Sequence, residues 1–257
     1  MLTQPEVPPE FRSCGRCRRM HGREFKLSFA FQPIVDLKQR SVYAYEALVR
    51  GPKGQSAWSV LSEVDEENRY DFDQACRIQA IRSAAELGIH ERLSINFLPN
   101  AVYHPATCIQ HTFNAAREAG YPVENIIFEV REGEKVRDRP HLVNIFREYR
   151  RYGFVTAIDD FGAGLAGLEL LSEYQPHIVK LDMQLVRGID TDRVRQAIVR
   201  GVLGMCHKLD VCVLAEGVET VGERDWLANA GVDLMQGYLF GKPTLRTVRE
   251  IDPAVWH

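Results

Sequence analysis

Two adjacent carboxylates, Asp159 and Asp160, follow an apolar stretch and precede two spaced glycines, Gly162 and Gly164. The apolar residues predict a buried strand, and the glycines predict that it gives way to a loop. Successive strand residues point to opposite faces, so both carboxylates can share one ligand only where the strand is turning. Burying two like charges so close together is costly unless a cation lies between them or they share a proton. We therefore expect a divalent metal ion at this position.

Polar residues also stand at the ends of other apolar stretches, and one fold would bring them to a single mouth: Glu46, Asn96, Glu129, Asp159, Asp160, Lys180, Asp182 and Glu216. Their oxygen atoms are hard ligands, and no histidine or cysteine stands among them, which favours Mg²⁺ or Mn²⁺ over Zn²⁺. Two ions about 3.5 to 4 Å apart suit the attack of water on a phosphodiester. Lys180 would orient that water and stabilise the developing negative charge.

The elements that must position these residues alternate between strand and helix. We predict strands at 28–35, 42–49, 93–97, 126–130, 155–160, 177–182, 211–216 and 233–240. We predict helices at 57–64, 72–87, 105–119, 142–152, 168–171, 194–209 and 219–230. This order fits an α/β (β/α)8 barrel, the TIM barrel, in which active sites lie at the C-terminal ends of the strands. A doubly wound sheet is the alternative, but the chain has neither a GxGxxG nor a GxxxxGK[ST] loop.

Each motif also has a structural interpretation when it is taken alone. The period of two places Glu46 on the same face as Arg50, so these residues could form a structural ion pair. Asp159 could cap a helix, and Lys180 with Asp182 could be a solvated strand end. Their joint occurrence at successive strand ends favours a functional site over these readings.

Composition excludes several classes of protein. The 257 residues have a formal net charge of -3 and are 45% hydrophobic, so no broad basic surface for a nucleic-acid polymer is expected. No apolar run approaches the roughly 18 residues of a membrane-spanning helix, and the N-terminus does not resemble a signal peptide. The six cysteines are expected to be reduced thiols, as in a cytoplasmic protein.

Residues 1–26 are rich in proline and arginine, and we interpret them as an N-terminal extension to a domain at 27–257. Cys14, Cys17 and His21 could supply three zinc ligands, but a structural zinc site needs four. A surface tail without metal is the preferred interpretation.

Eight segments in order resemble the signatures of EAL domains: Phe31-Gln32-Pro33-Ile34-Val35, Glu46-Ala47-Leu48-Val49-Arg50, Ile95-Asn96-Phe97-Leu98-Pro99, Glu129-Val130-Arg131-Glu132, Asp159-Asp160-Phe161-Gly162-Ala163-Gly164, Lys180-Leu181-Asp182, Ala215-Glu216-Gly217-Val218-Glu219-Thr220 and Gln236-Gly237-Tyr238-Leu239-Phe240. The resemblance covers about residues 27 to 250. It implies a cyclic di-GMP phosphodiesterase that opens the ring to linear pGpG, lowering a bacterial second messenger that controls biofilm and motility. It also implies an antiparallel first strand in the barrel, and a homodimer.

The resemblance implies a role for each matching residue. Metal ligands would be Glu46, Asn96, Glu129, Asp159, Asp160 and Glu216, and the catalytic residues would be Lys180, Glu46, Glu216 and Asp182. Substrate contacts would be Gln32, Leu48, Arg50 and Gln236. Glu132 would anchor the loop after Asp160, and Glu219 would be a supporting acid near the mouth. The expected cofactors are two Mg²⁺ or Mn²⁺ ions, and Ca²⁺ is expected to inhibit because its coordination is longer and more flexible.

Two departures from the family pattern leave a second hypothesis open. Leu165-Ala166-Gly167 stands where an aromatic residue and two serines are common, and Arg131 stands where threonine is common. The altered loop and the absence of a sensor domain favour, as the alternative, a non-hydrolysing cyclic di-GMP receptor or protein-interaction module. Any regulation would come from the extension, the dimer or a regulatory protein partner.

Overall fold

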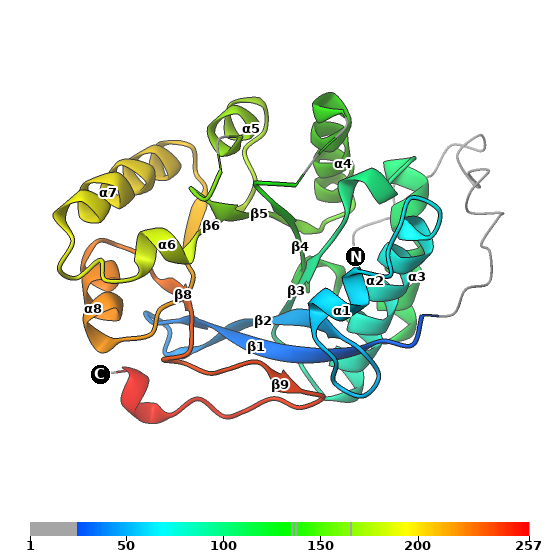
Figure 1. Ribbon diagram of the computed structural model, residues 1–257, viewed down its shortest axis with the longest axis horizontal. Helices are drawn as coiled ribbons and strands as arrows, with labels where there is room; N and C mark the ends of the chain where they lie inside the picture. The colour runs from blue at the N-terminus through cyan, green and yellow to red at the C-terminus, as the bar shows by residue number, and fades with distance from the viewer. Residues whose placement is uncertain (1–24, 135, 137, 165, 257) are drawn as a thin grey trace.

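A closed barrel of eight strands is the centre of the structure (Figure 1), a computed structural model that describes residues 25–134, 136, 138–164 and 166–256. The strands are β1 (Ser28–Asp36), β2 (Ser41–Arg50), β3 (Arg92–Asn96), β4 (Ile126–Arg131), β5 (Val155–Phe161), β6 (Ile178–Leu181), β7 (Cys212–Ala215) and β8 (Leu234–Gln236). They are hydrogen-bonded in the order β2-β3-β4-β5-β6-β7-β8-β1, and β1 also pairs with β2, which closes the ring. The predicted barrel is confirmed. The Cys14, Cys17 and His21 motif lies outside the described residues.

The first strand runs antiparallel to its neighbours, as expected. β1 pairs antiparallel with both β2 and β8, whereas the pairs from β2 to β8 are parallel. A short turn joins β1 to β2, and Arg40 in that turn has a φ of 52°. Because this connection is a hairpin, it contains no crossover helix. An unpredicted strand, β9 (Thr244–Leu245) of the C-terminal segment, pairs antiparallel with Ala30 and Phe31 of β1, beyond the β8 pairing at Ile34 to Asp36 (Figure 1).

Helices surround the rest of the barrel: α1 (Ala57–Leu61), α2 (Arg69–Glu86), α3 (Pro105–Glu118), α4 (Arg139–Arg151), α5 (Gly167–Glu173), α6 (Met183–Val186), α7 (Arg193–Lys208) and α8 (Val221–Asn229). Short 3₁₀ turns lie at Pro99–Ala101, Val123–Asn125 and Pro253–Trp256. The helices α2 and α3 lie on the opposite side of the barrel from α7 and α8 (Figure 1). No helix in the described part of the chain is long and apolar enough to cross a bilayer.

Two elements end at least three residues earlier than predicted, and one helix was not predicted. α1 ends at Leu61, and α6 was not predicted because it is a single turn capped by Asp182. The last barrel strand ends at Gln236, well before residue 240. The cause is a close backbone approach, because a Cβ at Gly237 would stand 2.0 Å from the carbonyl oxygen of Val218.

An apolar layer fills the barrel interior below its C-terminal mouth. Its fully buried residues come one from each of seven strands: Ile34, Ala44, Ile127, Ala157, Ile178, Leu214 and Leu234. Each lies two positions from a polar residue on the same strand face, because side chains alternate with a period of two. Packed layers of this kind are typical of TIM barrels. The layer therefore forms a floor, and the polar residues stand directly above it.

A buried ion pair lies in the larger core between the barrel and the helices. Arg77 of α2 is fully buried, and its guanidinium lies 2.7 Å from Asp73 Oδ2 and donates a hydrogen bond to the hydroxyl of Tyr149. The same guanidinium lies 5.3 Å from the ring centre of Phe97 and 5.0 Å from that of Phe128. Removing one partner of such a pair leaves the other charge buried without compensation.

We predict that Arg77→Met lowers the free energy of unfolding by about 3 to 5 kcal/mol, because Asp73 then remains buried without its cation. Arg82→Met on the same helix is the matched control, since Arg82 and its ion-pair partner Glu118 both have exposed side chains. The control should cost under about 1 kcal/mol. Denaturant unfolding of both variants measures the difference, and equal stability would contradict the prediction.

Candidate active site

Polar side chains from β2 to β8 meet above the apolar floor of the barrel. Glu129 follows Ile127 by two positions, Lys180 follows Ile178, and Glu216 follows Leu214. The carboxyl ends of parallel strands meet at one rim of a barrel, so residues far apart in sequence become neighbours. Most of the predicted site residues lie in the last residues of these strands or directly after them, and Glu46 lies in the middle of β2: Glu46, Asn96, Glu129, Asp159, Asp160, Lys180, Asp182 and Glu216.

Lys180 lies at the centre of this group and is fully buried. Its Nζ lies 2.8 Å from Glu216 Oε1, 2.9 Å from Glu129 Oε2 and 2.9 Å from Asp159 Oδ1. Glu46 Oε2 is 3.9 Å away. One ammonium thus faces four carboxylates, which leaves the cluster with a negative balance that a further cation would reduce.

Burial and mutual charge change the ionisation of these groups. Burial raises the pKa of Glu129 to about 8, although Lys180 opposes the change, and burial likewise raises the pKa of Glu216 well above its ordinary value. Burial would also raise the pKa of Asp159, but the Lys180 ammonium and further hydrogen bonds outweigh it and lower that pKa. For Lys180, burial lowers the pKa, but the surrounding carboxylates together raise it well above its ordinary value. The lysine therefore keeps its proton at neutral pH.

Glu46 is held by side chains from three other strands. Asn96 Nδ2 donates to its Oε1 at 3.1 Å, and Gln236 Nε2 donates to its Oε2 at 2.7 Å. The structure gives Lys180 as its ion-pair partner, so the alternative pairing with Arg50 is wrong. Arg50 instead donates to the carbonyl of its neighbour Val49.

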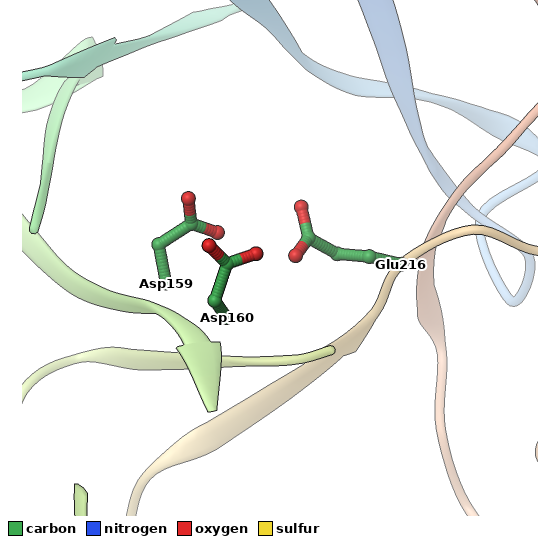
Figure 2. Close-up of side chains that lie close together, drawn as sticks. All are labelled: Asp159, Asp160 and Glu216. Atoms are coloured by element: carbon green, nitrogen blue, oxygen red, sulfur yellow. The ribbon is translucent and has the colours of Figure 1, made fainter. Parts of the chain in front are cut away.

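Asp159, Asp160 and Glu216 form a cluster that could hold a metal ion, and Figure 2 shows their carboxylates pointing toward one another. One ligand oxygen from each lies within 4.8 Å of the others. Asp159 Oδ1 is buried, and its ion-pair partner is the Lys180 ammonium 2.9 Å away. Carboxylate oxygens are hard ligands, and they fit Mg²⁺ or Mn²⁺.

The loop after Asp160 is tied to β4 by Glu132. The buried carboxylate of Glu132 accepts hydrogen bonds from the backbone N–H groups of Gly162, Gly164 and Gly167, at 2.7, 3.2 and 2.7 Å. A Cβ at Gly167 would stand 2.8 Å from the Phe161 ring, so a side chain at this position would require the ring or the loop to shift. Leu165 of the same loop lies outside the described residues.

Except for Arg50, the remaining predicted substrate-contact and supporting residues line two cavities at the mouth or border them. A cavity of about 290 Å³ is lined by Gln32, Glu46, Asp160, Asp182, Met183, Arg187, Glu216, Gly217, Glu219, Gln236, Gly237 and Tyr238. Asp182 caps α6 by accepting the Gln184 N–H at 2.8 Å. Glu219 accepts a hydrogen bond from Arg187 at 2.7 Å.

A second cavity, of about 420 Å³, is lined by Leu48 and Asn96 among other residues. Arg50 lines neither of these two cavities.

Sequence reasoning missed residues that support the site. Ser94 of β3 donates its hydroxyl to Glu129 Oε1, and Asp73 of α2 accepts the Leu98 N–H at 2.9 Å, two residues beyond Asn96. Ser94 could have been found, because it is a polar residue on the same strand face as Asn96. Asp73 gave no such signal, since helical spacing alone does not show which strand end a helix will touch.

The raised pKa of Glu129 predicts a pH-dependent metal affinity. Glu129 is predicted to be a metal ligand, and a carboxylate binds a divalent ion only when it is ionised, so an ion bound there would displace the proton that Glu129 holds below about pH 8. We expect Mn²⁺ affinity to rise by up to about tenfold per pH unit from pH 6 and to level off above pH 8. Calorimetric titration in two buffers of different ionisation enthalpy should show proton release at pH 6.5 and little at pH 9. An affinity that is constant from pH 6 to 8 would contradict this.

The same shift has a consequence for the metal-free protein. Because the folded-state pKa of Glu129 is raised, the stability it contributes is fully present below its unfolded value of about 4.5 and is lost as the pH rises through about 8. The metal-free protein should therefore lose thermal stability over this window through Glu129, and added Mn²⁺ should restore it at the upper end.

Comparison with known proteins identifies the family. The EAL domain matches residues 17–243. Among solved structures, a standalone versatile EAL protein from Vibrio cholerae O395 in its c-di-GMP bound form has a TM-score of 0.88 at 49% sequence identity, over 91% of this chain and 99% of that chain. The manganese/cy-diGMP complex of Klebsiella pneumoniae BlrP1 at pH 9.0 has a TM-score of 0.83 at 36% identity, over 90% of this chain and 59% of that chain.

Curated relatives are longer than this chain. The blue light- and temperature-regulated antirepressor BluF of Escherichia coli is 31% identical over 224 residues, which are 87% of this chain and 56% of BluF. The probable cyclic di-GMP phosphodiesterase PdeG of the same organism is 29% identical over 224 residues, which are 83% of this chain and 44% of PdeG. The chain thus spans about half the length of these two relatives.

Proposed function

Because the chain belongs to the EAL domain family, we propose that it is a phosphodiesterase that hydrolyses cyclic di-GMP to linear pGpG with two divalent ions. The observation that carries the proposal is the convergence of Glu46, Glu129, Asp159 and Glu216 on the Lys180 ammonium, with Asp160 beside them. Burying this many acidic side chains close together lowers the stability of the fold, so the cluster indicates a functional site and not a structural one. Relatives that are named as cyclic di-GMP phosphodiesterases support the substrate.

The carboxylates and the amide of Asn96 are the residues that would hold the ions: Glu46, Asn96, Glu129, Asp159, Asp160 and Glu216. Divalent ions bound there would neutralise the phosphodiester charge and activate water as a nucleophile. Mg²⁺ or Mn²⁺ fits this role better than Ca²⁺, because the longer and more flexible coordination of Ca²⁺ does not hold a compact geometry.

Lys180 would hold and orient the attacking water through its ammonium. Because its pKa is raised well above the ordinary value, it donates hydrogen bonds and does not act as a base. In the reaction the water oxygen adds to phosphorus and loses one proton, one phosphorus–oxygen ester bond breaks, and the ribose oxygen leaves and takes up one proton, so the step balances. The ammonium also stabilises the charge that develops on the phosphoryl oxygens.

The open mouth would receive the dinucleotide. Gln32, Leu48 and Gln236 line the two cavities that adjoin the carboxylates, and we propose them as substrate contacts. Arg50 would reach a substrate phosphate only by leaving the Val49 carbonyl. Asp182 and Glu219 support the rim, because each fixes a segment that borders the smaller cavity.

Hydrolysis of cyclic di-GMP by the purified protein tests the proposal. The reaction is run with Mg²⁺, with Mn²⁺, with Ca²⁺ and without metal, and the products are separated chromatographically. We expect conversion to pGpG with Mg²⁺ or Mn²⁺ only. Tight binding without conversion in every arm would refute the enzyme.

That second outcome would favour a non-hydrolysing cyclic di-GMP receptor or protein-interaction module. The relative named BluF is an antirepressor, which is a regulatory role, and this is the observation that favours the alternative. Binding would then depend on the mouth but not on the ammonium of Lys180.

The homodimer, the cytoplasmic location, the regulatory protein partner and the division into an extension at 1–26 and a domain at 27–257 stay predictions. Exposed apolar side chains on α5 and α7, Leu168, Val194 and Ile198, provide surface that a second copy could cover. Sedimentation of the purified protein would decide the oligomeric state.

A further inference from the structure

Two cationic side chains, Lys180 and Arg131, form ion pairs with the five carboxylates proposed as metal ligands. Lys180 pairs with Glu46, Glu129, Asp159 and Glu216, and the ion pairs of the described residues give it no contact with Asp160. Asp160 pairs instead with Arg131, whose Nε lies 2.5 Å from Asp160 Oδ2. Arg131 is the last residue of β4, and its neighbour across the ladder is Asp159.

The backbone of Asp160 is constrained on both sides. Asp160 has a φ of 55°, in the left-handed region that residues other than glycine rarely adopt. Its carbonyl accepts the Ala163 N–H at 3.1 Å, and the loop that follows is held by Glu132. This backbone sets where the Asp160 side chain leaves the chain, and the carboxylate lies between the Arg131 guanidinium and the cluster with Asp159 and Glu216.

Arg131 and a divalent ion would need the same carboxylate. Asp160 supplies one of the three oxygens that lie within 4.8 Å of one another in the metal-competent cluster, and Arg131 already donates to Asp160. A guanidinium beside that cluster repels a dication, and its hydrogen bond engages the carboxylate that the dication would use. The arginine and the ion therefore compete.

We propose that Arg131 is an intramolecular stand-in for the second divalent ion, which the ion must displace, so that this residue sets the metal concentration at which the site fills. The inference rests on the proposed function and names a positioning residue for its metal requirement. Lys180 is buried and stays in place, whereas the Arg131 side chain is 67% exposed and can swing into solvent. Because the arginine is exposed and Asp160 is half-buried, the effect is a shift of affinity and not a block.

The magnitude follows from charge and distance. A single positive charge several ångströms from a dication in a water-like medium lowers its affinity by about 5- to 10-fold. Replacing Arg131 by glutamine removes that charge while keeping a polar side chain. Glutamine should therefore tighten the weaker of two Mn²⁺ sites by this factor and leave the stronger site within about twofold.

Calorimetric titration of the metal-free protein with Mn²⁺, without substrate, tests the inference. The variants are Arg131→Gln, Arg131→Lys and the control Arg139→Gln, which removes an exposed arginine paired with Glu169. We expect tighter binding at the weaker site in Arg131→Gln alone, because lysine keeps the charge. A second ion that binds only in Arg131→Gln would also support the inference.

Several results would overturn it. These are an unchanged or weaker second site in Arg131→Gln, an equal gain in Arg131→Lys or in the control, or no Mn²⁺ binding in any variant. An Arg131→Gln variant with a raised KM for cyclic di-GMP and unchanged Mn²⁺ affinity would make Arg131 a substrate contact instead. Hydrolysis is measured separately, so a chain that binds Mn²⁺ as expected but converts no cyclic di-GMP would refute only the proposed function.

Discussion

Replacing Lys180 with alanine should lower the rate of cyclic di-GMP hydrolysis by about 100- to 1,000-fold, while Mn²⁺ still binds. The loss follows because the ammonium that orients water and stabilises developing charge is removed from a site where water cannot replace it. Four carboxylates then lose their shared cation, so the metal-free variant should be about 3 to 5 kcal/mol less stable. Mn²⁺ should restore much of this stability, because the ion supplies the missing positive charge.

The two readouts separate catalysis from folding. Thermal unfolding with and without Mn²⁺ reports stability, and product separation reports the rate at saturating metal. Lys208→Ala is the matched control, since Lys208 is exposed at the end of α7 and far from the carboxylates in the fold. A Lys180→Ala variant that is folded with Mn²⁺ and hydrolyses at the wild-type rate would exclude the proposed role.

Replacing Glu46 should be nearly as damaging, for a different reason. Glu46 accepts hydrogen bonds from Asn96 and Gln236, and both of its oxygens are therefore acceptors. In Glu46→Gln one oxygen becomes an amide donor that faces another donor, and the charge available to a metal ion is lost. We expect Mn²⁺ affinity and the rate of hydrolysis each to fall by at least about 100-fold.

Glu46→Gln is more informative than Glu46→Ala because it preserves side-chain volume. Glu118→Gln serves as the control, since Glu118 forms an exposed ion pair with Arg82. If Glu46→Gln binds Mn²⁺ with wild-type affinity in the same calorimetric titration, Glu46 is not a metal ligand. Wild-type hydrolysis at saturating Mn²⁺ would remove it from the reaction.

The barrel itself could be predicted with little error from local patterns. Strand and helix periods place most elements within a few residues of their structural bounds, because amphipathic faces are a local property of the chain. The exceptions depend on distant contacts. β9 forms because the C-terminal segment lies against β1, and β8 ends where Gly237 meets Val218.

By itself, the sequence determined which residues could do chemistry, because the alternation of side chains along each strand puts one polar residue above each apolar floor residue. Tertiary structure alone decided how these residues share charge. Gln236 and Glu46 meet across 190 positions, since barrel closure joins β8 and β2 through β1. Lys180 forms ion pairs with four carboxylates, and Arg131 forms one with the fifth, Asp160. Burial raises the pKa of Glu129, whereas the Lys180 ammonium outweighs burial at Asp159 and lowers its pKa. Distances and desolvation set these outcomes, and neither quantity exists until the chain has folded.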